Sequence, residues 1–136
     1  MALRISLRDG EKAIVNGAVL RSIGRTDVLI ENGASVMRGR DVMKPDEANS
    51  PARRLYFACM MAYIDAGDLV AYQNEIIERV AGLIEVLESP EAKAACARFA
   101  EKVATGQYYK ALAECRWLIS YESEALGRLE APAADR

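Results

Sequence analysis

The stretch KPDEANSPARR, residues 44–54, separates two parts of the sequence that have different hydrophobic periods. Its prolines, its Asn-Ser pair and its acidic residues are typical of a connector. Before it, apolar and polar residues alternate with a period of two, as in LRISLR at residues 3–8. After it, apolar residues recur every three or four positions, which predicts helices. The expected fold class is α+β, with a small antiparallel β module over residues 1–44 and a helical bundle over residues 45–136, together forming one cooperative unit.

Four or five short strands joined by tight turns are expected in the β module. In the first strand, Leu3, Ile5 and Leu7 should share one face. The Asn-Gly pair at residues 16–17 predicts either a tight hairpin or a bend in one long strand. A sheet this small has open edges and an uncovered face. We therefore expect a homodimer in which two β modules pair about a two-fold axis.

About four helices are expected after the connector. The Ser-Pro pairs at residues 50–51 and 89–90 predict helix starts, with serine as the N-cap and proline in the first turn. The first helix is apolar on nearly every side, so it should be buried in the core or in an oligomer interface. The expected helices cover about residues 51–65, 68–88, 90–106 and 107–127.

The sequence contains none of the residue sets that common enzymes require. It has no histidine, which excludes Ser-His-Asp and Cys-His catalysis and histidine-dependent zinc sites. It also has no glycine-rich phosphate loop. Cys59, Cys96 and Cys115 form no CxxC pair, so we expect reduced, buried thiols. We predict a protein that is not an enzyme and that uses no metal or cofactor.

Charge is divided unevenly along the chain. Residues 1–54 carry ten Lys/Arg against seven Asp/Glu, a net charge of +3, whereas residues 55–136 carry eight against thirteen, a net charge of −5. A basic front and an acidic back suggest two surfaces with different partners. No apolar run is long enough to cross a bilayer, and the first ten residues lack the apolar stretch of a signal peptide. We therefore expect a cytoplasmic protein.

The arginines of the basic part are candidates for nucleic-acid binding. Guanidinium groups bind phosphate in a bidentate geometry and stack on bases, so arginine-bearing strands can bind single-stranded RNA. No acidic residue is expected opposite these arginines in the strand alternation, and Arg38 and Arg40 should share one strand face. The alternative is a solvated strand face whose charges protect the sheet edge. The candidate RNA-binding arginines are Arg4, Arg8, Arg38, Arg40, Arg53 and Arg54.

The first helix raises two questions of its own. Arg53 and Arg54 fall in its first turn, an unfavourable end for cations, so an acidic side chain or a bound phosphate should compensate. Its aromatic and methionine-rich run is either core or a groove for a partner protein, as in a helical chaperone or adaptor. Exposure of Tyr56, Met60 and Tyr63 would favour the partner groove, and burial would favour the core.

Three motifs resemble the flagellar biosynthesis repressor FlbT family of alphaproteobacteria: VNGAV at residues 15–19, PARRLYF at residues 51–57 and MMAY at residues 60–63. The similarity runs from Leu3 to about Leu118. The resemblance implies a post-transcriptional repressor of flagellum biogenesis that associates with the 5′ untranslated region of flagellin mRNA and promotes its degradation by a cellular ribonuclease. It also implies a FlaF-family partner. The adaptor alternative then becomes a chaperone that binds flagellin or another flagellar protein through its helices.

The β module is also similar to the carbon storage regulator family of small RNA-binding β proteins. The similarity rests on LRDGEKAIVNGAV at residues 7–19 and VMRGRDVM at residues 36–43. It implies RNA contacts from Arg8 and Arg38, with Ser6 on the contacting strand, and dimerisation by strand exchange. The segment between the two motifs is shorter here than in that family, and a leucine precedes Arg8 where a second arginine is usual.

Overall fold

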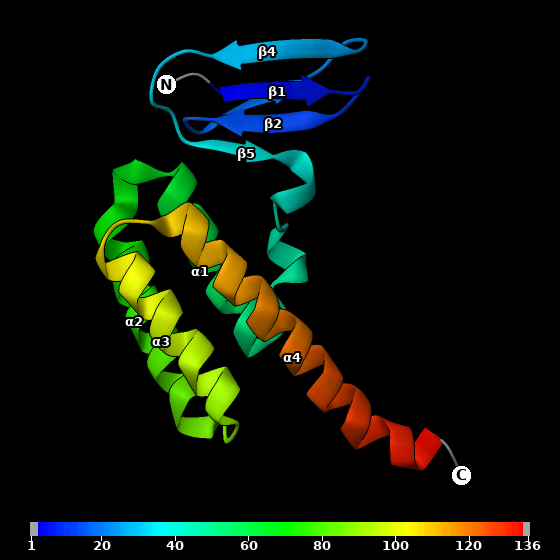
Figure 1. The fold of residues 1–136 in the computed structure, drawn as a ribbon, viewed down its shortest axis with the longest axis vertical. Helices are drawn as coiled ribbons and strands as arrows, with labels where there is room; N and C mark the ends of the chain where they lie inside the picture. Colours follow the sequence, from blue (N-terminus) through cyan, green and yellow to red (C-terminus); the bar gives the residue numbers. More distant parts are fainter. Residues whose placement is uncertain (1–2, 135–136) are drawn as a thin grey trace. The chain divides into compact units, whose positions relative to one another are not determined.

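The computed structural model describes the backbone of residues 3–134 and the side chains of residues 3–65 and 67–125 (Figure 1). Within these residues, five short antiparallel strands are followed by four α-helices, which confirms the predicted α+β class. The chain divides into two compact units. The β unit contains the chain up to Val42 together with Tyr63–Gly67, and the helical unit contains Met43–Ala62 and the chain from Asp68 onward.

Two small sheets make up the β unit. One pairs β1 with β4, and the other has the order β3-β2-β5, with antiparallel pairing throughout. The short 3-10 helix η1, Gly39–Asp41, follows the last strand. The strands are β1 Leu3–Leu7, β2 Lys12–Val15, β3 Ala18–Arg21, β4 Thr26–Ile30 and β5 Val36–Arg38.

The Asn-Gly pair forms a tight hairpin, which decides between the two expected alternatives. Asn16 and Gly17 both have positive φ, 50° and 84°, as a type I′ turn requires. The two-residue turn fixes the register of β2 against β3, so that Lys12 lies opposite Arg21. This register places the two basic side chains on neighbouring strands at the same end of the sheet.

The apolar interior of the β unit comes from both sheets. Ile5 and Leu7 are buried as expected, but Leu3 is 49% exposed, so only part of the predicted strand face is covered. Leu3 is the first residue of β1, and its pair with Ile30 is the last pair at that end of the β1–β4 sheet. Tyr63 anchors β5, because its hydroxyl accepts a hydrogen bond from the Val36 N–H at 2.8 Å and donates one to the Val36 carbonyl at 3.0 Å.

The helices lie close to their predicted ranges, apart from the last, which continues to Ala134. At α3 the Ser89 hydroxyl accepts a hydrogen bond from the Ala92 N–H at 3.3 Å, which confirms the predicted N-cap. Short 3-10 helices occupy the connector, η2 Pro45–Glu47, and the turn before the second helix, η3 Ala66–Asp68. The helices are α1 Pro51–Ile64, α2 Leu69–Val86, α3 Pro90–Ala104 and α4 Tyr108–Ala134.

The core of the helical unit is apolar and contains all three thiols. Phe99 is fully buried, and Cys59, Cys96 and Cys115 are free and buried, as predicted. Burial raises the pKa of the Cys59 thiol to about 12. These thiols are therefore protonated core residues at neutral pH and not nucleophiles. None of the helices among the described residues is sufficiently long and apolar to span a membrane.

Candidate nucleic-acid interface

Arg4 and Ser6 face a carboxylate on the neighbouring strand. Asp27 of β4 lies directly opposite Ser6, accepts a hydrogen bond from the Ser6 hydroxyl at 2.6 Å and forms a salt bridge with Arg4 at 3.0 Å. These contacts, that with Ser6 first, lower the pKa of Asp27. The expectation that no acidic residue lies opposite the arginines is therefore wrong here. Sequence alternation along one strand does not reveal its neighbour, and Asp27 lies 21 residues along the chain from Ser6.

Arg38 joins the two sheets of the β unit. Its Nη2 donates to the Ser6 carbonyl of β1 at 2.6 Å and to Glu11 Oε2 at 3.1 Å. Glu11 also accepts the Arg8 backbone N–H at 3.0 Å through Oε1. These contacts, the Arg8 hydrogen bond first, lower the pKa of Glu11. The Nη2 group of Arg38 is therefore already bonded within the fold, and its Nε is buried without a partner, so neither is free to contact RNA.

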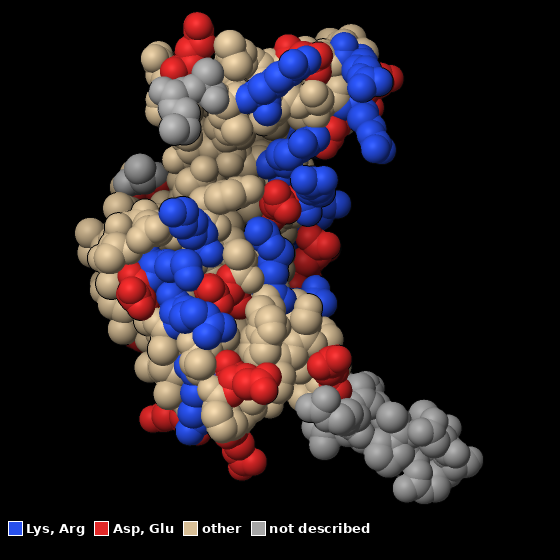
Figure 2. Space-filling model, in the orientation of Figure 1, with Lys and Arg blue, Asp and Glu red and all other residues tan. Residues whose placement is uncertain are grey.

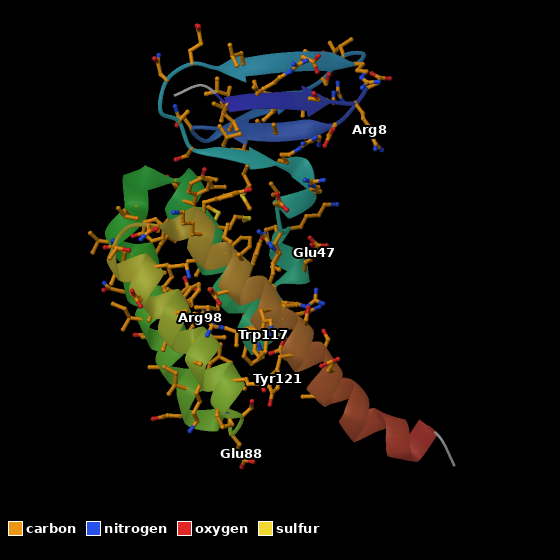
Figure 3. The ribbon with its side chains drawn as sticks, in the orientation of Figure 1. Arg8, Glu47, Glu88, Arg98, Trp117 and Tyr121 are labelled. Carbon is orange, nitrogen blue, oxygen red and sulfur yellow. The ribbon has the colours of Figure 1, made fainter. Side chains whose placement is uncertain are left out.

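Arg8 and Arg40 are exposed and carry no salt bridge to a described carboxylate. Arg8 follows the end of β1 and points away from the sheet (Figure 3). Arg40 lies in η1 and not on a strand, so it does not share a strand face with Arg38 as expected. The chain leaves β5 at Gly39, where a Cβ would come within 2.8 Å of the Lys12 carbonyl, so η1 packs directly against the start of β2.

Three further basic residues lie at this end of the β unit. Lys12 and Arg21 are exposed and face each other across the β2–β3 pair, and Arg25 is exposed in the turn before β4. The turns on either side are joined, because the Gly10 N–H donates to the Ser22 carbonyl at 2.8 Å and the Gly24 N–H donates to Asp9 Oδ1 at 2.8 Å. Figure 2 shows Lys and Arg side chains gathered at this end. We define the basic surface as Arg8, Lys12, Arg21, Arg25 and Arg40.

No described carboxylate forms a salt bridge with any member of the basic surface. Alternation along a single strand does not indicate Lys12, Arg21 or Arg25, because it does not show which residues lie opposite one another. A signal was present: a two-residue Asn-Gly turn at residues 16–17 places residue 12 opposite residue 21 by counting outward. The joined turns could not be found this way, because they depend on contacts between β1–β2 and β3–β4 connections.

The other two candidate arginines belong to the helical unit, in the first turn of α1. The anionic group expected there is an acidic side chain from α4. Glu122 accepts hydrogen bonds from the Ser50 hydroxyl and from the Ala52 N–H, the latter at 3.0 Å. This carboxylate therefore satisfies donors at the start of α1 and places a negative charge at the end of the helix that also carries Arg53 and Arg54.

The candidate partner-binding residues of α1 are core residues. Tyr56 and Met60 are 3% and 2% exposed. The Tyr56 hydroxyl accepts a hydrogen bond from Arg116 at 3.0 Å, and Met60 Sδ accepts the Met43 N–H at 3.3 Å. Tyr63 is half-buried and is bonded to β5. No exposed patch is formed by these three side chains, so this observation favours the core alternative.

One aromatic pair that the sequence did not suggest lies on α4. The rings of Trp117 and Tyr121 stack at 5.5 Å between centroids and 9° between planes (Figure 3). Trp117 is 38% exposed. The spacing of four residues that brings the rings together is visible in the sequence.

Among the described residues, the β unit carries the basic surface and the helical unit has an apolar core. No group of three or more His, Cys, Asp or Glu side chains within the described part of the chain could hold a metal ion. A surface of exposed cations is typical of proteins that bind anionic partners.

Comparison with known proteins identifies the family. The family described as "Flagellar protein FlbT" matches residues 3–126, and the chain belongs to it. A relative from Caulobacter sp. (strain K31), named "Probable flagellum biosynthesis repressor protein FlbT", is 39% identical over 95% of this chain and 99% of its own length. A relative of the same name from Rhodopseudomonas palustris (strain TIE-1) is 33% identical over 94% of this chain and 100% of its own. These names support a repressor of flagellum synthesis.

A third relative, from Agrobacterium fabrum, is 33% identical over 94% of this chain and 86% of its own length and bears the same name. No solved structure matches the chain. The family predicted from the motifs VNGAV, PARRLYF and MMAY is therefore confirmed.

Proposed function

We propose that this protein represses flagellum biogenesis after transcription, in the cytoplasm, by binding the 5′ untranslated region of flagellin mRNA through the basic surface of its β unit. Binding would promote degradation of the message by a cellular ribonuclease. The supporting observation is the set of five exposed cations with no described salt-bridge partner, which can neutralise phosphates without first breaking a salt bridge. Phosphate contacts of this kind position RNA on the protein and do not select its sequence.

The proposal changes which residues carry the function. Arg4, Ser6 and Arg38 are bonded within the β unit, so they support the surface and do not form it. Of the arginines predicted from the sequence to bind RNA, Arg8 and Arg40 belong to the basic surface. Its other members are Lys12, Arg21 and Arg25.

An equilibrium binding experiment with a labelled flagellin leader RNA tests the proposal. The double variant Arg21→Gln/Arg25→Gln removes two exposed cations that form no described salt bridge and should weaken binding at least tenfold at physiological salt. The single variant Arg8→Gln should weaken it by a smaller factor. Circular dichroism should show wild-type secondary structure in both, since these side chains are exposed.

Arg4→Gln is the matched control for Arg8→Gln, because the two variants change net charge equally. Arg4 is already paired with Asp27, so its loss should change RNA affinity much less. Equal effects of Arg4→Gln and Arg8→Gln would show that only total charge matters and would remove the basis for this surface. Undetectable binding of the wild type to the leader would contradict the function itself.

We also propose that the protein is a homodimer paired through the open edge of β3. This strand lies at the edge of its sheet, and all four of its residues are exposed, including Val19 at 65% and Leu20 at 45%. Edge strands of this kind pair with other chains unless they are protected. Sedimentation at micromolar concentration should give twice 14.9 kDa for the wild type and a monomer for Leu20→Lys. A monomeric wild type would contradict the proposal.

A FlaF-family protein or flagellin would then act as a protein partner rather than as the primary ligand. The alternative, in which the chain is mainly a flagellar chaperone, loses its expected surface with the burial of Tyr56 and Met60.

A further inference from the structure

One line of apolar side chains on α2 is exposed to solvent. Val70 and Ile77 are 69% and 61% exposed, and Ile84 is 38% exposed. They follow one another at intervals of seven residues, so they lie along one side of the helix. We call Val70, Ile77 and Ile84 the α2 stripe. A repeat of seven is the spacing by which one helix packs along another, and it does not match the period of a strand.

A groove between α2 and α3 lies beside this stripe, and the two helices run alongside each other (Figure 1). It has a volume of about 270 Å³ and is mostly apolar. Its walls include Ile76, Ile77 and Val80 of α2 and Ala100, Val103 and Ala104 of α3. Ile77 belongs to both the stripe and the groove. The alanines on the α3 side leave room for a helix backbone or a bulky side chain to approach closely.

Acidic side chains border the stripe. Glu78 and Glu85 directly follow Ile77 and Ile84, and both are exposed. Neither forms a salt bridge with a described residue, whereas Glu75, elsewhere on the helix, is paired with Arg79 at 2.7 Å. An apolar seam bordered by unpaired glutamates complements a helix with an apolar seam bordered by Lys or Arg.

We propose that the α2 stripe and the adjoining groove bind an amphipathic helix of a partner protein, with Lys or Arg flanking its apolar seam. A second copy of this chain fits less well, because two α2 helices would bring glutamates against glutamates along the same seam. The proposal does not rest on the proposed function, since the residues that carry it lie in the helical unit and the basic surface lies in the β unit.

Two synthetic helical peptides of 21 residues provide the test. Both carry Ile and Leu at the seam positions, one with Lys and the other with Glu at the flanking positions. Fluorescence anisotropy with the full-length chain should show binding of the Lys peptide, at least tenfold tighter than binding of the Glu peptide. Ile77→Ser should weaken binding of the Lys peptide at least fivefold.

Val86→Ser is the matched control, because Val86 is an exposed valine of α2, 70% accessible, that is not part of the stripe. It should leave peptide binding unchanged. The double variant Glu78→Lys/Glu85→Lys should reverse the preference, so that the Glu peptide binds more tightly than the Lys peptide. A reversal cannot arise from misfolding, which would abolish both interactions.

Equal affinity for the two peptides would overturn the proposal, as would equal effects of Ile77→Ser and Val86→Ser. Sedimentation tests the other possible occupant, a second copy of this chain. If the wild type is a dimer and Ile77→Ser is a monomer, the stripe is an interface between copies and the proposal is wrong. If Ile77→Ser still binds leader RNA, failure of the helix-binding proposal would leave the proposed RNA-binding function intact.

Discussion

The candidate binding surfaces of the two units differ in the sign of the charges that form no salt bridge. In the β unit, the cations of the basic surface form no salt bridge with a described carboxylate, while the acids Asp27 and Glu11 form salt bridges with Arg4 and Arg38. In the helical unit, Glu114 forms salt bridges with Arg98 at 3.0 Å and with Lys102 at 2.9 Å, and the α2 acids that follow the stripe are unpaired. Figure 2 shows acidic and basic side chains interleaved over the visible face of the helical unit.

The role of an arginine in this protein depends on its neighbours rather than on its position in a strand pattern. Arg38 and Arg40 are two residues apart. One is bonded to the Ser6 carbonyl and to Glu11, and the other is exposed and without a described salt bridge. Exposed cations without a salt bridge are available for the proposed phosphate contacts, whereas bonded ones hold the strands of the β unit together.

The largest expected effect comes from the helical core. Phe99→Ala removes a fully buried ring and should lower the free energy of unfolding by about 3–5 kcal/mol. If the two units unfold together, amide exchange in β1 and β2 should accelerate along with exchange in α3. Acceleration confined to the helices would show that the β unit folds on its own, contrary to the expected single cooperative unit.

A smaller loss of stability is expected in the β unit when Arg38 is replaced. Arg38→Ala removes the hydrogen bonds to Ser6 and Glu11 that join the two sheets, so it should lower the melting temperature by several degrees. Arg40→Ala, with the same change in charge, should leave it within about a degree, because Arg40 is exposed. Measured at a temperature where both variants are folded, RNA affinity should fall more in Arg40→Ala than in Arg38→Ala. Equal melting temperatures for the two variants would contradict the assigned structural role of Arg38.

A third, smaller effect depends on pH. The pKa of Glu11 is lowered in the folded state, chiefly by the Arg8 N–H and then by Arg38. Its stabilising contribution is therefore present above the ordinary pKa of 4.5 and is lost as pH falls through the lowered folded value. Glu11→Gln should have a lower melting temperature than wild type at pH 7. The difference in melting temperature between the two proteins should become smaller below pH 4. A gap that widens in acid would contradict this linkage.

Much of the fold follows from short-range patterns in the sequence. The Ser-Pro pair at residues 89–90 places the start of α3, and the Asn-Gly pair at residues 16–17 places the first hairpin, because both act within a few residues. The FlbT motifs identify the family for a similar reason, since they are contiguous. Burial of the three thiols also follows from their apolar helical surroundings.

The site was predicted less well because it depends on distant pairings. Asp27 lies opposite Ser6 across β1–β4, and the Arg38 contact spans 32 residues of sequence to reach Ser6. Neither partner follows from alternation along one strand. The Glu122 contact with the start of α1 spans about 70 residues, so the sequence could indicate that an anion was needed there but not which one.

The salt dependence of RNA binding tests the central claim most directly. If the five cations of the basic surface contact phosphates, a plot of log Kd against log salt for wild type should have a slope of about 3–4 per protomer, since each contact on a single strand contributes about 0.7. The variant Arg21→Gln/Arg25→Gln should lower this slope by about 1.4, and Arg4→Gln should leave it nearly unchanged. A wild-type slope near zero, or equal reductions in the two variants, would contradict the account.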